Sequence, residues 1–153
     1  MGDTRYVYRG APFATVPLRL VTYKPEYFDL AIELESEAFY ELRKRNNILP
    51  HKLNQSSEEE LEKIRAFLLR HKSTFFFLFE GNALVGNILI LKNFIQSVAV
   101  APGFRRKGYG TLLTRYGVNQ ILHSGYDRAE LKVLDGNVPA HAMYLKIGFE
   151  KCE

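Results

Sequence analysis

Apolar and polar residues follow two periods along the chain, which divide it into strands and helices. Alternation of apolar and polar residues predicts strands over residues 18–23 and 128–134. Three apolar runs, over residues 74–79, 83–91 and 94–100, are interpreted as three further strands. The Gly-Asn pair at 81–82 predicts a hairpin turn between the first two runs, because both residue types tolerate positive φ.

Apolar residues spaced three or four apart predict the helices. They are expected over residues 26–45, from Ser57 onward, over residues 108–123 and over residues 139–147. Ser57 and Glu60 form a capping-box pattern, and Gly125 and Gly148 stand where the last two helices should stop. The order of strand, two helices, three strands, helix, strand and helix predicts a mixed α/β or α+β domain.

Length and charge narrow the class of protein. The 153 residues contain no repeat, low-complexity tract or linker, so a single domain over residues 1–153 is expected. Hydrophobic residues make up 46% and charged residues 25%, which excludes a disordered chain. The formal net charge of +4 favours an anionic partner, either nucleic acid or a small polyphosphate ligand.

Several features bear on compartment, membrane and metal. Residues 74–91 are long enough to cross a membrane, but Glu80 and Asn87 interrupt them, so two strands are expected and no membrane partner. The first residues lack the apolar stretch of a secretory signal. The single cysteine, Cys152, excludes an internal disulfide and favours a reducing, cytoplasmic location. With four scattered histidines, it leaves no metal site with zinc-ligand spacing.

The segment with the most chemistry is SVAVAPGFRRKGYGTLL, residues 97–113, in which a strand enters a basic, glycine-containing loop and then a helix. The first N–H groups of a helix are unpaired and carry partial positive charge, and glycines let phosphate oxygens approach them. Such a charge run could also be only a solvated turn. Its position between strand and helix favours phosphate binding.

Two familiar phosphate loops do not fit this segment. A Walker A loop has Gly-Lys before Ser or Thr, whereas here Lys107 precedes Gly108. A dinucleotide loop needs a third glycine three residues after Gly110, and the next one is Gly117. Arg-x-x-Gly-x-Gly after Val-x-Val-x-Pro instead resembles the acyl-CoA-binding motif of the GNAT superfamily of N-acetyltransferases.

A second motif agrees with this resemblance. Asn137 is followed by VPAHAMYLKIGF, residues 138–149, which looks like the family's Asn before a short helix that carries a tyrosine and ends in Gly-Phe. The order of elements agrees over about residues 18–149. The resemblance implies a mixed, mostly antiparallel sheet flanked by helices, with acetyl-CoA as the acyl-donor substrate.

The resemblance also implies roles for individual residues. The strand before the loop would splay from its neighbour, and Val98 and Val100 would offer backbone groups to the pantetheine amides. Asn137 would bind the pantetheine arm, and Tyr144 would protonate the departing thiolate as the catalytic acid. Each of these two residues also has a purely structural interpretation. Asn137 could cap the following helix, which is compatible with binding, and Tyr144 could be only a packed aromatic residue. The pyrophosphate would be held by the loop residues Arg105, Arg106, Lys107, Gly108, Tyr109, Gly110 and Thr111.

The general base is not assigned by the sequence. The strand at 94–100 holds no Asp or Glu, and Lys132 stands where some family members place a glutamate. Gln96 or Ser97 could order a water molecule, and Glu35 or Glu37 could approach from the first helix. His141, one turn before Tyr144, is a weaker candidate, because such a histidine is more often on the surface or in a supporting position.

Three functions compete at this stage. The first is direct transfer, in a ternary complex, of an acetyl group from acetyl-CoA to a primary amine of a small molecule or protein. The alternative is a non-catalytic acyl-CoA-binding module, which the absence of an acid from the strand at 94–100 keeps open. Nucleic-acid binding rests on charge alone, and no nucleic-acid motif accompanies it. The acceptor is expected near residues 39–57, where no specific motif identifies it.

The two ends of the chain depart from the family pattern. Relatives usually continue past Gly-Phe for two strands, whereas five residues follow Gly148, enough for one short strand. Residues 4–9 alternate like an additional strand at the other end. We hypothesise that this segment, from its own chain or from a homodimer partner, covers part of the sheet. A truncated chain or a smaller sheet are the alternatives.

Overall fold

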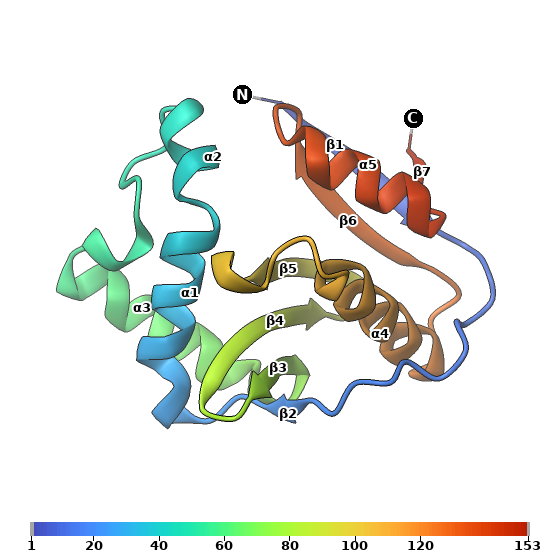
Figure 1. Cartoon of the computed structure of the whole chain (residues 1–153), viewed down its shortest axis with the longest axis horizontal. Helices are drawn as coiled ribbons and strands as arrows, with labels where there is room; N and C mark the ends of the chain where they lie inside the picture. Colours follow the sequence, from blue (N-terminus) through green and yellow to red (C-terminus); the bar gives the residue numbers. More distant parts are fainter. Residues whose placement is uncertain (1, 153) are drawn as a thin grey trace.

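The computed structural model describes residues 2–152, within which seven strands form one sheet flanked by helices (Figure 1). In chain order the elements are β1 (Asp3–Tyr8), β2 (Val21–Thr22), η1 (Pro25–Tyr27), α1 (Phe28–Ala38), α2 (Tyr40–Arg45), η2 (Leu53–Gln55), α3 (Glu58–Arg70), η3 (Lys72–Thr74), β3 (Phe75–Glu80), β4 (Ala83–Leu91), β5 (Phe94–Val100), η4 (Pro102–Phe104), α4 (Tyr109–His123), β6 (Ala129–Leu134), α5 (Val138–Ile147) and β7 (Glu150–Lys151). The strand order is β2-β3-β4-β5-β6-β1-β7. Neighbouring strands are antiparallel except β5 and β6, which confirms the predicted mixed, mostly antiparallel fold.

The apolar runs are continuous because the central strands are buried on both faces. In β3, Phe76 and Leu78 belong to a core that also contains side chains of α4 and α5. Phe75 and Phe77 point the other way, into a second core with side chains of α1 and α3. Successive side chains of a strand alternate between faces, so helices on both sides require apolar residues at every position.

The N-terminal segment is a strand in the body of the sheet. β1 pairs antiparallel with β6, with Tyr6 opposite Leu131, and on its other edge with β7, with Tyr6 opposite Lys151. The side chains of Tyr6, Val7 and Tyr8 are buried. The hypothesis that this segment covers the sheet is therefore confirmed, and here the strand comes from the chain's own N-terminus.

Two element predictions need correction. The strand predicted over residues 18–23 is only the two-residue β2; the chain before it runs irregularly, and the side-chain amide of Asn119 on α4 holds the backbone of Phe13 in both directions. The helix predicted over residues 26–45 breaks at Phe39 into α1 and α2. At the break, Arg105 Nη2 donates to the carbonyl of Ala38 at 2.8 Å, so a cation replaces the next helical turn as the partner of that carbonyl.

Several local signals are confirmed. Ser57 caps α3 by accepting from the backbone N–H of Glu60, and Gly81 turns the β3–β4 hairpin at φ +62°. Gly125 and Gly148 end α4 and α5 with φ of +102° and +121°. Each signal depends on residues within a few positions, which is why the sequence alone reveals it.

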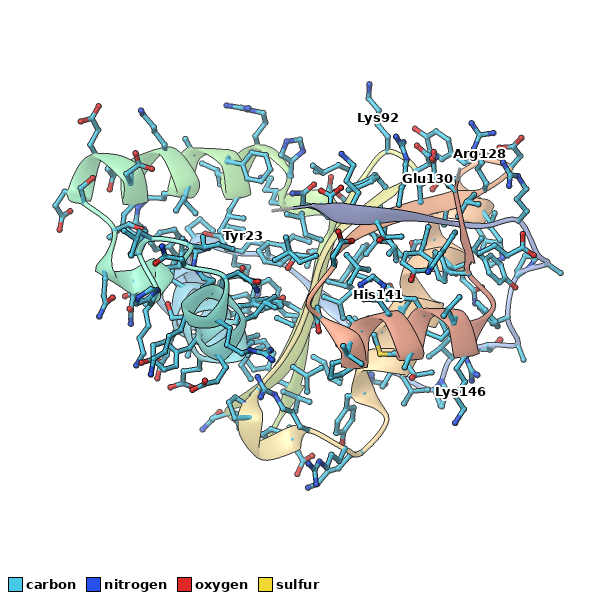
Figure 2. All side chains as sticks on the ribbon, turned by 90° about the horizontal axis from the view of Figure 1, so that it is seen from above. Tyr23, Lys92, Arg128, Glu130, His141 and Lys146 are labelled. Atoms are coloured by element: carbon cyan, nitrogen blue, oxygen red, sulfur yellow. The ribbon has the colours of Figure 1, made fainter. Side chains whose placement is uncertain are left out.

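Strands β5 and β6 meet at one end and then diverge. Their one registered pair is Phe94 opposite Glu130, next to which the Glu130 N–H donates to the Asn93 carbonyl. The Glu130 carboxylate accepts from Asn93 Nδ2 at 2.9 Å and from Arg5 Nε at 3.1 Å, and Arg128 lies beside it (Figure 2). This cluster fastens the closed end of a V whose open end faces α1 and α2 (Figure 1).

Candidate active site

The backbone of β5 is free to bind an extended ligand along the open arm of the V. The N–H of Ala101 donates to the carbonyl of Val85 on β4, and Ala99 lies opposite Asn87 in the same register. Because backbone groups alternate in direction along a strand, those of Val98 and Val100 point away from β4, into the gap. The splay expected from the family resemblance is therefore present, with both valines at its edge.

A groove at the end of β5, here called the phosphate groove, has a volume of about 540 Å³. At its base Gly108 is the N-cap of α4, with φ +83° and no side-chain cap, so the first N–H groups of this 15-residue helix face the groove without a capping partner. Arg106, two residues earlier, also has positive φ, at +62°. Residues with positive φ in such a loop can turn neighbouring N–H groups toward one point, an arrangement that binds anions.

The structure brings most of the predicted cofactor residues to this groove. Among its lining residues are Val98, Val100, Arg105, Arg106, Gly108, Tyr109, Gly110, Thr111 and Asn137. The side chain of Lys107 lies over the Phe104 ring, with Nζ 5.5 Å from the ring centroid. The guanidinium of Arg105 already donates a hydrogen bond to the Ala38 carbonyl. Of the two arginines, Arg106 therefore has more of its donors left for a ligand.

Gly110 is required by close packing between α4 and α5. A Cβ placed on Gly110 would lie 3.1 Å from the sulfur of Met143, closer than such contacts normally are. Val100 Cγ2 would lie 3.9 Å away on the other side. A larger residue would therefore push α5 away from the groove or project into the space above the helix N-terminus.

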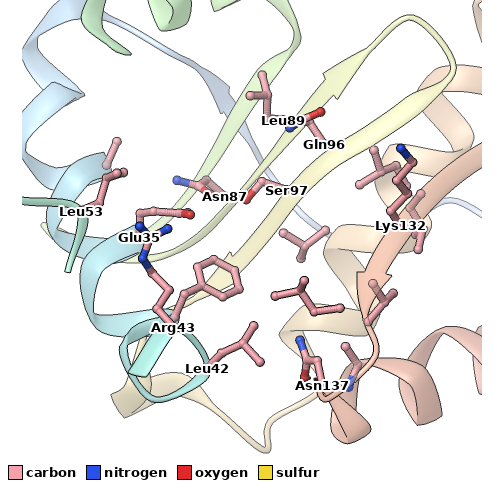
Figure 3. A pocket seen from close by; sticks show the side chains of 18 of the residues that line it. Glu35, Leu42, Arg43, Leu53, Asn87, Leu89, Gln96, Ser97, Lys132 and Asn137 are labelled. Carbon is pink, nitrogen blue, oxygen red and sulfur yellow. Dashed lines mark hydrogen bonds between the residues drawn. The ribbon is translucent and has the colours of Figure 1, made fainter. Parts of the chain in front are cut away.

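A second cavity of about 540 Å³, here called the inner cavity, lies between the β5–β6 gap and helices α1 and α3 (Figure 3). Its walls near α1 and α3 are mostly apolar. Its polar groups come from Glu35, Arg43, Asn87, Gln96, Ser97 and Lys132, with Asn137 and Tyr144 at the α5 side. The two cavities meet, because six residues line both: Phe39, Leu42, Val98, Asn137, Ala140 and Met143. A ligand in the phosphate groove can therefore extend into the inner cavity.

Tyr144 lines the inner cavity but is itself mostly enclosed. It packs edge-on against Phe149, with ring centroids 5.7 Å apart, and belongs to the core around α4 and α5. Burial raises the pKa of Tyr144 to about 12, and an interaction with the Thr114 side chain lowers it in part. The phenol is therefore fully protonated at neutral pH and available as a hydrogen-bond donor.

Glu35 is the carboxylate that α1 places on the wall of the inner cavity. It points toward Asn87 and Ser97 across the cavity (Figure 3). Burial raises the pKa of Glu35 to about 7, and the positive charge of Arg43 opposes that shift. Glu37, the other glutamate considered as a base, is exposed. Helical spacing in the sequence could have distinguished the two candidates, because Glu35 lies on the same helix face as the apolar Phe28 and Ile32 and Glu37 does not.

His141 and Asn137 have structural partners. The Tyr6 hydroxyl lies 2.5 Å from His141 Nδ1, and His141 Nε2 lies 3.0 Å from the Leu134 carbonyl. With both ring nitrogens occupied, His141 supports the fold rather than acting as a base. Asn137 accepts from the Ala140 N–H as the N-cap of α5, as the structural interpretation expected, while it lines both cavities.

Sequence reasoning expected the acceptor near residues 39–57, but it did not identify which residues there line the cavities, and it did not single out Asn87. Phe39, Leu42 and Arg43 reach the cavities only because the helix breaks at Phe39, which brings α2 over the open end of the V. Asn87 carried a usable signal: an amide within the otherwise apolar β4 run is a polar group that burial would strand without a partner. Among residues 2–152, no group of three His, Cys, Asp or Glu side chains is placed to hold a metal ion.

Comparison with known proteins identifies relatives of this chain. Residues 31–149 match the model of the Acetyltransferase (GNAT) family. A streptothricin acetyltransferase from Streptomyces lavendulae is 36% identical over 58 residues, 38% of this chain and 31% of that protein. A GCN5-related N-acetyltransferase from Sphaerobacter thermophilus has a similar structure, with a TM-score of 0.74 at 17% identity over 98% of this chain and 48% of that one.

A third relative was solved with its ligand. The PaiA N-acetyltransferase from Thermoplasma acidophilum, in complex with coenzyme A, has a TM-score of 0.60 at 18% identity, over 86% of this chain and 89% of that one. The chain spans less than a third of the length of the curated relatives it matches, and about half of the Sphaerobacter protein. Within residues 2–152, no helix is both long and apolar enough to cross a bilayer.

Proposed function

Because the chain belongs to the acetyltransferase (GNAT) family, we propose that it transfers an acetyl group from acetyl-CoA to a primary amine of a small molecule or protein. The observation that carries the proposal is the joining of two cavities along the free edge of β5. One has the backbone geometry of an anion site, and the other encloses a carboxylate and a phenol. The point where they join is where a thioester would meet an amine.

Acetyl-CoA would occupy the phosphate groove from its pyrophosphate inward. The pyrophosphate would accept from the N–H groups of Gly108, Tyr109, Gly110 and Thr111, with Arg105, Arg106 and Lys107 adding positive charge around it. The pantetheine arm would lie beside β5, where Val98 and Val100 offer backbone groups, and Asn137 would contact it from α5. The thioester would then reach the inner cavity.

The reaction would be direct attack in a ternary complex. The amine must be neutral to attack, and a lysine-like ammonium with pKa near 10.4 loses roughly 4–5 kcal/mol of driving force at pH 7 in becoming so. Attack on the thioester carbonyl forms the C–N bond and expels the thiolate of coenzyme A. A backbone N–H near the end of β5 would hold the carbonyl oxygen as negative charge develops on it.

Tyr144 would assist the departing sulfur. A phenol with pKa about 12 is a weaker acid than a thiol near 8.5, so complete proton transfer to the free thiolate is uphill. A hydrogen bond from the phenol to the sulfur, strengthening as the C–S bond breaks, is the form of help that this pKa permits. The contribution is expected to be moderate, because a thiolate is already a fair leaving group.

The proposal includes acetyl-CoA and the amine as partners, with no nucleic acid, no membrane and no metal. Residues 1–153 would act as one domain in the cytoplasm, in keeping with the lone Cys152. A homodimer in which two copies exchange β1 would make the same strand pairs as a single chain. Light scattering of the full chain separates these states by mass.

One assay tests transfer against mere binding. Full-length protein is first titrated with acetyl-CoA in a calorimeter, and is then mixed with acetyl-CoA and a panel of primary amines while free thiol is followed. Binding together with amine-dependent thiol release supports the proposed function. Binding without thiol release, with every amine tried, would identify an acyl-CoA-binding module instead.

A further inference from the structure

The Glu35 carboxylate lies in the inner cavity, and the proposed transfer gives it no role. Among residues 2–152, no hydrogen bond or ion pair is made by the Glu35 carboxylate, although the residue is half-buried in the wall of the inner cavity and burial raises its pKa. Arg43, the cation whose charge acts on Glu35, donates Nε to the Pro50 carbonyl at 2.7 Å and forms no ion pair with Glu35. A carboxylate that is partly removed from water and has no protein partner is costly to a fold, which points to a ligand as its partner.

Resting on the proposed function, we propose that Glu35 is the general base that takes a proton from the acceptor amine, and that the acceptor carries this amine on an apolar body held by the floor of the inner cavity.

The position of Glu35 suits a base. It lies on the same cavity wall as Phe39 and Leu42, two of the residues at which the inner cavity joins the phosphate groove. Ser97 and Asn87 face it from the sheet, on the side of β5 and β4 that points toward α1 (Figure 3). An ammonium group held by Glu35 would therefore stand beside the end of the pantetheine channel, within the same cavity as the thioester.

The floor of the cavity defines the class of acceptor. Beyond Glu35, the wall is formed by apolar side chains of α1, η2, α3, β3 and β4: Ala31, Ile32, Leu53, Ile64, Phe67, Leu68, Phe75 and Leu89. These groups offer no hydrogen bonds to a hydroxylated or sugar-like acceptor. An aliphatic or aromatic amine would bury its carbon skeleton there and leave only its nitrogen beside Glu35.

The proton and electron balance is simple. The acceptor enters as R–NH₃⁺, and one proton passes to the Glu35 carboxylate, leaving R–NH₂ and a carboxylic acid. The nitrogen attacks the thioester carbon, the C–N bond forms, and the C–S bond breaks with its electron pair on sulfur. A second nitrogen proton ends on the sulfur, and the third stays on the amide. Glu35 then returns its proton to solvent.

The electrostatic setting supports this role. The other titratable or charged groups lining the cavity are Arg43 from α2, Lys132 from β6 and Tyr144 from α5. Arg43 and Lys132 are cations and repel a positively charged ligand group. The position beside the Glu35 carboxylate is therefore the most favourable place in the cavity for an ammonium group. With a pKa of about 7, Glu35 is largely ionised just above neutral pH yet basic enough to accept a proton.

The test compares Glu35→Gln with Glu37→Gln, an exposed glutamate on the same helix. The probes are 2-phenylethylamine and ethanolamine, two primary amines that differ in their apolar part, each with acetyl-CoA and the full chain. For the wild type we expect kcat/KM at least about tenfold higher with 2-phenylethylamine, from burial of the ring. Glu35→Gln should lower that value about 100-fold at pH 8, while Glu37→Gln leaves it unchanged.

The pH profile separates a base from a structural group. The ratio of wild type to Glu35→Gln in kcat/KM cancels the titration of the amine itself, and it should fall as pH drops through about 7. A ratio within twofold from pH 6 to 9 would overturn the role of Glu35, and equal values for the two amines would overturn the apolar acceptor class. If the wild type does not bind acetyl-CoA, or releases no thiol with any amine, the proposed function itself is wrong, and the role of Glu35 falls with it.

Discussion

The phenol oxygen of Tyr6 and Nδ1 of His141 lie 2.5 Å apart, although 135 residues separate them in the chain. The contact fastens β1, which lies between β6 and β7 in the sheet, to α5, which carries Tyr144 and lines both cavities. The N-terminus and the candidate active site are therefore mechanically connected.

Replacing Tyr6 by phenylalanine should destabilise the fold by about 1–2 kcal/mol, because it leaves a partly buried His141 nitrogen without its partner. Urea denaturation of the two proteins gives the difference. Tyr126→Phe, which removes a hydroxyl from an exposed ring, is the matched control. Equal losses in the two variants would mean that the Tyr6–His141 contact contributes nothing specific.

Replacing Gly110 by valine should weaken acetyl-CoA binding at least about tenfold. The side chain would collide with Met143 and stand over the helix N-terminus, so a charge-assisted hydrogen bond to phosphate would be lost. Gly108→Val should act similarly through its φ of +83°. In Gly103→Ala the new methyl group meets nothing within 4 Å, so its affinity in calorimetry should match the wild type.

Replacing Tyr144 by phenylalanine should lower kcat about 10- to 100-fold, the value of a hydrogen bond to a charged group, while acetyl-CoA affinity is kept. The phenyl ring preserves the packing against Phe149. Because the pKa of Tyr144 is about 12, its ionisation should produce no decline in activity below pH 10. Steady-state kinetics from pH 6 to 10 test both points, and a change of less than twofold in kcat throughout would exclude the phenol from the reaction.

Replacing Glu35 by glutamine should stabilise the protein at pH 8. The pKa of Glu35 is raised from 4.5 to about 7 on folding, so the folded state binds the extra proton and stability falls as pH rises between these values. Above pH 7 the penalty is complete, up to about 3 kcal/mol for a shift of this size. Denaturation at pH 5 and pH 8 measures it: the gain should be present at pH 8 and mostly absent at pH 5, and Glu37→Gln should show neither.

Replacing Glu130 by glutamine should destabilise the protein at neutral pH. The hydrogen bond from Asn93, followed by the charges of Arg5 and Arg128, holds the pKa of Glu130 below its usual value of 4.5. This contribution is present above pH 4.5 and is lost as pH falls through the lowered pKa. The difference between wild type and variant in thermal unfolding should therefore shrink on acidification. A difference that is constant from pH 7 to pH 3 would exclude the electrostatic explanation.

Local signals were sufficient for much of the fold and for the phosphate groove. The Ser57 cap, the Gly81 turn and the strand-loop-helix around Gly108 each depend on neighbours in sequence. The break at Phe39 could not be read this way, because its stabilising partner, Arg105, arrives from a loop far along the chain. Helical periodicity could have predicted that Glu35, and not Glu37, faces the interior. The cavity beside Glu35 could not be predicted in this way, because α3 and the sheet form its walls.

The placement of β1 also governs when the fold can be completed. During synthesis β1 must wait for its partners, because Arg5 contacts Glu130 and Tyr6 pairs with Leu131 and Lys151, all of which are translated much later. Meanwhile β3, β4 and β5 can form as local hairpins at low entropic cost. Closing β1 between β6 and β7 is then expected to be the late step of folding, and the step at which a neighbouring nascent chain could donate its own first strand instead.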